Sequence, residues 1–348
     1  MTYKEENIMF GIESTAYDKK VYAEQLQDFL PDTLVDVHVH LWTPESRKGY
    51  VRSDNVVTWP ELVAPDCTYE DLMSSYATMF PDKKVYPILM TTPSCHLHIG
   101  NPYVQDYAKK TNLPALYCIT PETSEAEIRK AFSNGFCGIK PYLNYAPAYI
   151  PAKEIRIYDF ITPAQFELMN ELNGVVMLHI SRDGRLNDPV NIAQLMEIDQ
   201  RYPNAKVIVA HIGRAYTPES LGNAFDTLRN SQNLYFDFTA TTYDPAMTAC
   251  INAVGTKRFM FGSDMPITKM RMYRVTENGT YINVVPRGLY GDVSLDPHMR
   301  ESDEENITTF MYEELLAFKR SAQKLGLSRE DVEDILCNNA IRLFNMNI

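Results

Sequence analysis

The sequence predicts an α/β protein that folds as a closed (β/α)8 TIM barrel. Eight short apolar runs recur along the chain, and most of them are separated by a polar segment that is compatible with a helix. The runs are residues 34–42, 84–91, 115–120, 136–143, 174–181, 206–212, 233–239 and 258–264. Nearly continuous apolar strands are typical of a parallel sheet covered on both faces, and eight such units favour a barrel. A doubly wound open sheet is the alternative, but no G-x-G-x-x-G follows the first run.

Helices are predicted before, between and after these strands. The first helix is stopped by Pro31, because proline cannot continue a helical hydrogen-bond ladder. The last helix is opened by Ser328, and Asp331 three residues later makes this start close to a capping box. The expected helices cover residues 18–29, 69–79, 102–111, 124–133, 163–173, 190–202, 218–230, 245–254, 307–324 and 329–345.

We predict one domain over residues 1–348. Apolar residues make up 45% and charged residues 22% of the chain, which is ordinary for a globular protein with a substantial core. Residues 1–33 are expected to form an N-terminal extension, and residues 43–80 and 267–306 are expected to be insertions near the barrel mouth. The second insertion is polar and irregular in sequence, and it fits either a lid or a surface excursion.

The net charge and the cysteine pattern restrict the kinds of binding partner and the cellular compartment that we expect for this protein. The formal net charge is −12, and lysine and arginine do not form runs, which argues against nucleic acid and anionic membranes as partners. The six cysteines form no C-x-x-C pair, so we expect free thiols in a reducing compartment. The N-terminus has no signal pattern, and no apolar run is long enough to span a bilayer. We therefore expect a cytoplasmic protein with a small-molecule substrate, and the sequence leaves homodimer formation open.

Polar side chains late in the strands predict a metal site. His38 and His40 lie two residues apart in the first strand and therefore point to the same face, although such a pair alone more often belongs to an ordinary half-buried strand. His179, His211 and Asp264 also lie late in strands, and the carboxyl ends of barrel strands meet at one mouth. Closure places the eighth strand beside the first, so Asp264 is expected next to the histidine pair. Four imidazoles and one carboxylate suit zinc or another divalent transition metal.

Five motifs carry a resemblance to a known family. They are Asp36-Val37-His38-Val39-His40, Leu178-His179, Ala210-His211-Ile212-Gly213, Phe261-Gly262-Ser263-Asp264-Met265-Pro266 and the closing helix from Ile335 to Phe344. In this order, over residues 34–345, the chain resembles the amidohydrolase superfamily. The resemblance is to its amidohydrolase-related (amidohydrolase 2) branch, which contains metal-dependent hydrolases and non-oxidative decarboxylases. The two insertions depart from the pattern and leave the substrate open.

The resemblance implies roles for individual residues. His38, His40 and His179 would be metal ligands, and Asp264 would complete or closely flank the coordination sphere. A metal in such a site lowers the pKa of a bound water to about 7. Asp264 would then act as general base and general acid, and His211 would polarise the substrate carbonyl or stabilise the developing oxyanion.

Three functions remain open at this point. The first is a metal-dependent hydrolase of a small amide, lactone or ester that uses a metal-activated water at the barrel mouth. The second is a metal-dependent decarboxylase of a small aromatic or unsaturated carboxylic acid, and the third is a catalytically inactive barrel that acts as a binding protein. One zinc ion is expected, and manganese would satisfy the same ligands. Binuclear relatives carry a carboxylated lysine at the end of the fourth strand, where Lys140 falls, so a two-metal site is the alternative.

Residues in the mouth loops are expected to contact the substrate. The predicted contacts are Lys140, Arg182, Arg214, His98, Tyr142 and Trp42. A guanidinium at the mouth suits a carboxylate-bearing substrate, and Arg185 shares this position, although an arginine after a strand is often only a surface residue. His98 lies beside His96 in a stretch that favours a turn. Tyr142 and Trp42 fit an aromatic-friendly pocket or ordinary packing.

Overall fold

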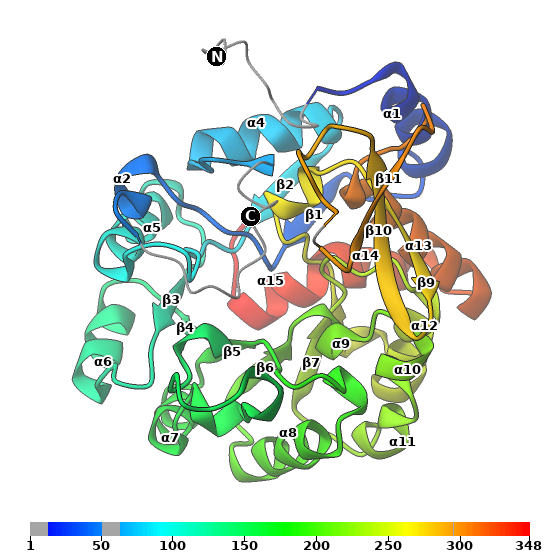
Figure 1. The fold of residues 1–348 in the computed structure, drawn as a ribbon. Coiled ribbons are helices and arrows are strands. Elements are labelled where there is room, and N and C mark those ends of the chain that lie inside the picture. Colours follow the sequence, from blue (N-terminus) through cyan, green and yellow to red (C-terminus); the bar gives the residue numbers. More distant parts are fainter. Residues whose placement is uncertain (1–12, 51–62, 295) are drawn as a thin grey trace.

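The computed structural model describes residues 13–50, 63–294 and 296–348, and its central feature is a ring of parallel strands (Figure 1). Each strand overlaps one of the eight predicted apolar runs and is shorter than that run. The strands are β1 Thr33–Asp36, β2 Lys84–Pro87, β3 Leu116–Ile119, β4 Gly138–Pro141, β5 Val175–Leu178, β6 Lys206–Val209, β7 Leu234–Asp237 and β8 Phe259–Met260. The predicted α/β fold with a parallel sheet is confirmed.

Single backbone contacts close the ring between its two continuous parts. Strands β3 to β8 form one parallel sheet in chain order, and β1 pairs in parallel with β2. Leu89 bridges to Ala115 between the second and third strand segments, and Val39 bridges to Met265 between the first and the eighth. Closure places the segment after β8 directly beside the segment after β1, as the sequence predicts.

Helices surround the sheet and lie between successive strands (Figure 1). Several begin at capping boxes, such as Ser124 with Glu127, whose side chains satisfy the backbone N–H groups of the first turn. The predicted single helix over 218–230 is wrong, because Gly222, with φ of 46°, ends α10. The helices are α2 Pro44–Arg47, α4 Tyr69–Met79, α5 Leu97–Thr111, α6 Glu125–Ser133, α7 Pro163–Leu172, α8 Pro189–Arg201, α9 His211–Arg214, α10 Pro218–Leu221, α11 Ala224–Leu228 and α12 Asp244–Val254.

The ends of the chain pack beneath and beside the barrel. The N-terminal helix is α1 Ala16–Val21, continued by a π-turn at Tyr22–Leu26, and α13 Phe310–Leu325 follows the second insertion. The predicted capping box at Ser328 is confirmed. The predicted helix over 329–345 is confirmed: α14 Arg329–Glu333, a π-helical segment at Asp334–Asn338 and α15 Asn339–Phe344 follow one another without a break. Within the π-helical segment the Ile335 carbonyl accepts a hydrogen bond from the Phe261 N–H, at 3.0 Å.

The insertion at 267–306 is ordered, and the expectation of irregular structure there is wrong. It contains a three-stranded sheet made of β9 Tyr273–Glu277, β10 Thr280–Pro286 and β11 Met299–Ser302. Asn278 and Gly279 join β9 and β10 with positive φ angles of 49° and 76°. Asn-Gly between two strands is a strong signal for a tight hairpin turn, and this signal was present in the sequence. The sheet covers a small separate core that includes Met270, Val285 and Tyr290.

The main hydrophobic core contains residues from Val21 to Met346, which supports the proposal of a single domain. Cys137 is half-buried, and the other five cysteines are buried; all six are free. Within the described ranges, no helix is both long and apolar enough to cross a membrane.

A buried ion pair joins the N-terminal helix to the insertion. Both guanidinium nitrogens Nη1 and Nη2 of Arg271 donate to the Asp18 carboxylate, at 3.0 and 2.5 Å. Burial alone would raise the pKa of Asp18, but the hydrogen bonds from Arg271 and Thr308 outweigh this effect and hold the pKa below its usual value. The pair therefore stabilises the fold while Asp18 is ionised.

We expect Asp18→Asn to lower the free energy of unfolding by about 3 kcal/mol at pH 7, because it leaves a buried guanidinium without its counterion. A lowered folded-state pKa gives stability that is present above the unfolded pKa and is lost as the pH falls through the folded pKa. The difference between variant and wild type in urea unfolding should therefore shrink below about pH 4. Asp303→Asn, which removes an exposed partner of Arg287, is the control and should cost less than about 1 kcal/mol. Equal losses in both variants would contradict this prediction.

Candidate metal centre

The backbone after β1 carries His38 and His40 into the barrel mouth. The His38 carbonyl accepts from the Asp264 N–H at 2.8 Å, and the His40 N–H donates to the Met265 carbonyl at 2.7 Å. These two hydrogen bonds join the segment after β1 to the segment after β8, and they thereby close the barrel. Closure therefore positions the histidine pair and the carboxylate of Asp264 on facing segments.

Asp36 supports this arrangement from below. Its carboxylate accepts hydrogen bonds from the backbone N–H groups of His38 and Ser263, at 3.1 and 2.9 Å, and from the Tyr76 hydroxyl at 2.6 Å. Asp36 thus holds the backbone of both facing segments and does not contact an imidazole. Burial raises the pKa of Asp36 to about 7.

The structure brings the four predicted histidines and Asp264 together. His40 Nε2 lies 3.0 Å from Asp264 Oδ1, and His38 Nε2 lies 3.9 Å from the same oxygen. His179 Nε2 lies 2.7 Å from His211 Nε2. Two overlapping triads result, one of His38, His179 and His211 and one of His38, His40 and Asp264, with the ligand atoms of each within 4.8 Å of one another. Either triad could hold a metal ion.

The outer nitrogens of three imidazoles face oxygen acceptors. Nδ1 of His38 lies 3.2 Å from the Asp237 carboxylate, and Nδ1 of His211 lies 2.9 Å from the Thr239 carbonyl. Nδ1 of His40 lies 3.3 Å from the Thr91 carbonyl. An acceptor at Nδ1 selects the tautomer that carries its hydrogen there, so Nε2 presents a lone pair to the centre. This is the arrangement that imidazole ligands of metals adopt.

Like the other four residues of the predicted set, His211 follows its strand and does not lie in it, because each strand is shorter than the predicted run. Strand β6 ends at Val209, and His211 occupies a tight turn with φ of 57°. Gly213 in the same turn has φ of 58°, and a Cβ there would lie 2.5 Å from a Leu186 carbon. The His211 N–H donates to Asp237 Oδ1 at 2.7 Å, which fixes the turn against β7.

Asp237 is a site residue that the sequence interpretation missed. It is fully buried and contacts both His38 and the backbone of His211. Burial raises the pKa of Asp237. Its signal was available, because it is the one charged residue in the apolar run 233–239 and lies late in that strand, as the predicted ligands do in theirs.

Burial sets the protonation of the centre. It lowers the pKa of His38 and His179 well below the usual value, with a further contribution from the positive charge of Lys140. Burial also lowers the pKa of His211 to about 4. Burial alone would raise the pKa of Asp264, but the hydrogen bond with His40 and nearby positive charges hold it below its usual value. At neutral pH His38, His179 and His211 are therefore uncharged and Asp264 is ionised, which are the forms that bind metals.

Lys140 lies inside the centre rather than at its rim. Its Nζ is 2.8 Å from His179 Nδ1 and 3.4 Å from His38 Nε2, and the side chain is fully buried. Burial lowers the pKa of Lys140, although the negative charge of Asp237 opposes this effect. His179 therefore differs from the other three histidines, because its Nδ1 faces an amine in place of an oxygen.

Comparison with known proteins identifies the family. The family model described as Amidohydrolase (Amidohydro_2) matches residues 35–346. The chain belongs to the amidohydrolase family. It is 27% identical over 254 residues to a protein of Schizosaccharomyces pombe described as a probable dihydroorotase, across 66% of this chain and 69% of that one. The predicted family and its enzymatic class are confirmed.

Solved structures share the fold at low identity. One is described as a probable 2-pyrone-4,6-dicarboxylic acid hydrolase from Acinetobacter baumannii with citric acid bound, at a TM-score of 0.56, 13% identity and coverage of 90% of this chain and 99% of that one. A dihydroxybenzoic acid decarboxylase from Polaromonas sp. JS666 with bound manganese and 2-nitroresorcinol has a TM-score of 0.56, 13% identity and coverage of 91% and 98%. An amidohydrolase from Burkholderia multivorans with bound zinc has a TM-score of 0.56, 11% identity and coverage of 90% and 100%. They support the barrel fold of this amidohydrolase.

The remaining predicted contacts divide into two groups in this amidohydrolase. Tyr142 lies at the centre, because its ring stacks on His179 at 5.7 Å between centroids and its hydroxyl lies 3.2 Å from His40 Nδ1. Arg214 lies close enough for its charge to add to the effect of burial on the pKa of His179 and His211. Both residues remain candidates for substrate contact.

Trp42, Arg182 and His98 are not brought to the centre. The Trp42 indole is buried and donates to the Pro65 carbonyl at 3.0 Å. Arg182 pairs with Asp188, which caps α8. The expected turn is present at residues 93–95, just before α5. His98 itself is exposed in the first turn of α5, and it lines a groove between α5 and α6. Ordinary packing and local ion pairing explain these three positions.

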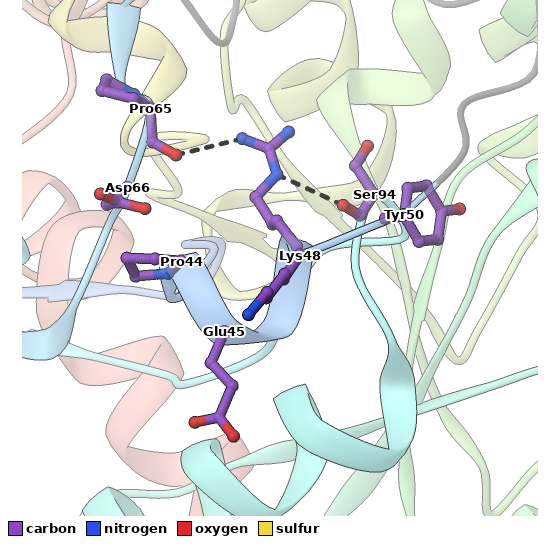
Figure 2. Close-up of a pocket in the computed structure, with 8 residues that line it drawn as sticks. Pro44, Glu45, Lys48, Tyr50, Pro65, Asp66 and Ser94 are labelled. Carbon is purple, nitrogen blue, oxygen red and sulfur yellow. Dashed lines mark hydrogen bonds between the residues drawn. The ribbon is translucent and has the colours of Figure 1, made fainter.

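A separate surface pocket opens beside α2 (Figure 2). Arg47 spans it and donates to the carbonyls of Ser94 and Pro65, both at 3.3 Å. None of the described residues that line this pocket belongs to the two triads. This pocket is therefore separate from the histidine centre.

Proposed function

We propose that this protein is a metal-dependent hydrolase of a small amide, lactone or ester. One divalent ion, zinc rather than manganese, is held by His38, His40, His179 and Asp264. The observation that carries the proposal is the approach of His40 Nε2 to Asp264 Oδ1, at 3.0 Å. Both atoms are electron-pair donors in the neutral imidazole and the ionised carboxylate, so this contact is favourable when a cation is shared between them. Donor atoms that share one tetrahedral zinc ion lie about 3.3–3.6 Å apart, so a single ion could bind both atoms after a small movement of either side chain.

The ion, when bound, polarises a carbonyl and makes water nucleophilic at neutral pH. Asp264 Oδ1 faces the histidines, and no hydrogen bond of Oδ2 is found among the described residues. Oδ2 is therefore available to take the proton of the attacking water and to pass it to the leaving nitrogen or oxygen. The lowered pKa of Asp264 keeps this base ionised at neutral pH.

Of the two roles that the resemblance implies for His211, polarising the substrate carbonyl is not favoured by its hydrogen bonds. Its Nδ1 hydrogen is directed to the Thr239 carbonyl, so Nε2 accepts and does not donate in the neutral imidazole. Polarising a substrate carbonyl would require a second proton, which the burial of His211 opposes. We therefore propose that His211 accepts a hydrogen bond from the attacking water or the substrate, and that it does not supply the proton that stabilises the oxyanion.

Decarboxylation is the second candidate. Lys140 supports it, because its buried amine beside His38 and His179 places a positive charge where a substrate carboxylate would enter. In that reaction the carbon–carboxyl bond breaks, carbon dioxide leaves, and a proton is delivered to the ring carbon by the group that serves as base in hydrolysis. The third function, a catalytically inactive barrel that acts as a binding protein, is rejected because the family consists of enzymes.

Metal analysis of the purified protein, followed by substrate panels, tests this proposal. We expect about one zinc per chain and hydrolysis of a lactone, amide or ester that stops when the metal is chelated. Two ions per chain would make Lys140 a bridging ligand in place of the single-metal site. Carbon dioxide release from hydroxybenzoates without any hydrolysis would replace the first candidate with the second. Protein that binds no divalent metal after reconstitution would overturn both.

Location in the cytoplasm also remains part of the proposal. The six free cysteines support it, because thiols persist in reducing compartments.

A further inference from the structure

Three guanidiniums and two phenol rings gather beside the histidine centre. We call this set the arginine–tyrosine cluster, and its members are Arg185, Arg214, Arg274, Tyr216 and Tyr281. Arg185 follows β5 and Arg214 follows β6, whereas Arg274 lies in β9 and Tyr281 in β10. The inserted sheet therefore completes a group that the barrel loops begin.

Cation–π contacts hold the cluster together. The Arg274 guanidinium lies 4.6 Å from the Tyr216 ring centroid and 4.5 Å from that of Tyr281. The Arg185 guanidinium lies 5.4 and 4.9 Å from the same two rings. His298 stacks on Tyr281 at 4.2 Å with an angle of 5° between the rings. Arg185 and Arg274 are thus held in a defined arrangement against the two tyrosine rings.

Within the part of the chain that the structure describes, no acidic side chain forms an ion pair with the cluster, that is, with Arg185, Arg214 or Arg274. Nearby arginines outside the cluster do have such partners: Arg182 pairs with Asp188 and Arg300 with Glu277. Burial lowers the pKa of Arg185, and the positive charge of Arg214 lowers it further. Three half-buried cations at one place repel one another, and an anion that enters relieves this repulsion.

The cluster is continuous with the centre. The Tyr216 ring lies 6.4 Å from the His211 ring, edge to face. Arg214 is in the same turn as His211, and all three arginines remain partly exposed. A small molecule could therefore touch the cluster with one end and the histidine centre with the other.

We propose that the arginine–tyrosine cluster binds a carboxylate of the substrate that is remote from the group that reacts at the histidines. Planar guanidiniums match a carboxylate with paired hydrogen bonds, and the tyrosine rings offer apolar contact to the carbon skeleton next to it. The inference rests on the proposed function for what happens at the other end of the substrate. The inference adds to the proposed function that the substrate carries a second group, a carboxylate, and that the inserted sheet takes part in binding it.

The test uses 4-fluorobenzoate and its neutral counterpart 4-fluorobenzamide as probes, with binding to the zinc-loaded full chain followed by fluorine NMR. We expect the carboxylate to bind at least about tenfold more tightly than the amide, because it adds charge-assisted hydrogen bonds. Arg214→Gln and Arg185→Gln should each weaken carboxylate binding about tenfold while the zinc content stays unchanged. Within the described ranges the Arg214 side chain makes no hydrogen bond, so we expect its replacement to leave the fold intact.

The controls separate this inference from the proposed function. Arg300→Gln, in the same inserted sheet but in an exposed pair with Glu277, should bind both probes as the wild type does. Unchanged carboxylate binding in both cluster variants would overturn the inference and leave the metal-dependent function standing. Inorganic phosphate displacing 4-fluorobenzoate at equal concentration would also overturn it, because the cluster would then select charge and not a carboxylate. If the chain holds no metal, cluster-dependent binding of 4-fluorobenzoate is still expected, and only the proposed function fails.

Discussion

The His179→Ala variant is expected to lose both its zinc and its catalytic turnover. His179 has Nε2 directed to His211 at 2.7 Å and belongs to a triad with His38. Removing one ligand from a set of four typically weakens zinc binding by several kcal/mol, because each ligand contributes directly to the coordination bond energy. We expect the zinc content of the dialysed variant to fall below about 0.1 per chain. Elemental analysis and the rate of hydrolysis are the two measurements.

Two controls make this result specific to the ligand. His98→Ala replaces an exposed histidine in α5 and should retain its zinc. The circular dichroism spectrum of His179→Ala should match that of the wild type, because the barrel strands do not depend on this imidazole. A variant that keeps one zinc per chain would show that His179 is not a ligand and that His211 takes its place in the sphere.

The Asp264→Asn variant should keep most of its zinc and lose its activity. An amide oxygen can remain near His40 where Asp264 Oδ1 now lies, at 3.0 Å, but an amide cannot take a proton from water. Loss of a general base lowers the rate by roughly 10² to 10⁴, so we expect kcat to fall by about a thousandfold. The measurement is kcat of protein whose zinc content has been verified.

The comparison of Asp264→Asn with His179→Ala separates two roles. If Asp264 acts mainly as a ligand, the two variants lose zinc alike and added zinc restores neither. If Asp264 acts as the base, only His179→Ala loses zinc. Full activity of Asp264→Asn would remove this residue from the mechanism and direct attention to His211 as the proton acceptor.

Much of the fold could be predicted because its determinants are local. An apolar run such as 206–212 must be buried, and burial on both faces of a strand is possible only in a covered parallel sheet. The start of α6 could be predicted from Ser124 and Glu127, because a capping box involves only neighbouring residues. The inserted sheet was missed because its strands are half-exposed and mix polar with apolar residues.

The part of the candidate site that depends only on the order of the strands was predicted from the sequence. Because parallel strands end at one mouth, His38, His40 and Asp264 could be expected side by side, and the structure places them so. Asp237 was missed although it satisfies the same positional rule. His98 and Trp42 were expected at the mouth because they follow strands, but a loop can turn its side chains in any direction, and these two turn away from the centre.

The sequence by itself determined the number and order of the eight barrel strands, the family, and the histidines and carboxylate that converge at the mouth. These features depend on periodicity and on residue type at strand ends, both of which are readable along the chain. Only the tertiary structure decided that Asp237 orients His38, that Lys140 lies inside the centre, and that Arg274 joins Arg185 and Arg214. These contacts join residues far apart in the sequence, and their geometry depends on how the barrel closes and on how the inserted sheet packs over it.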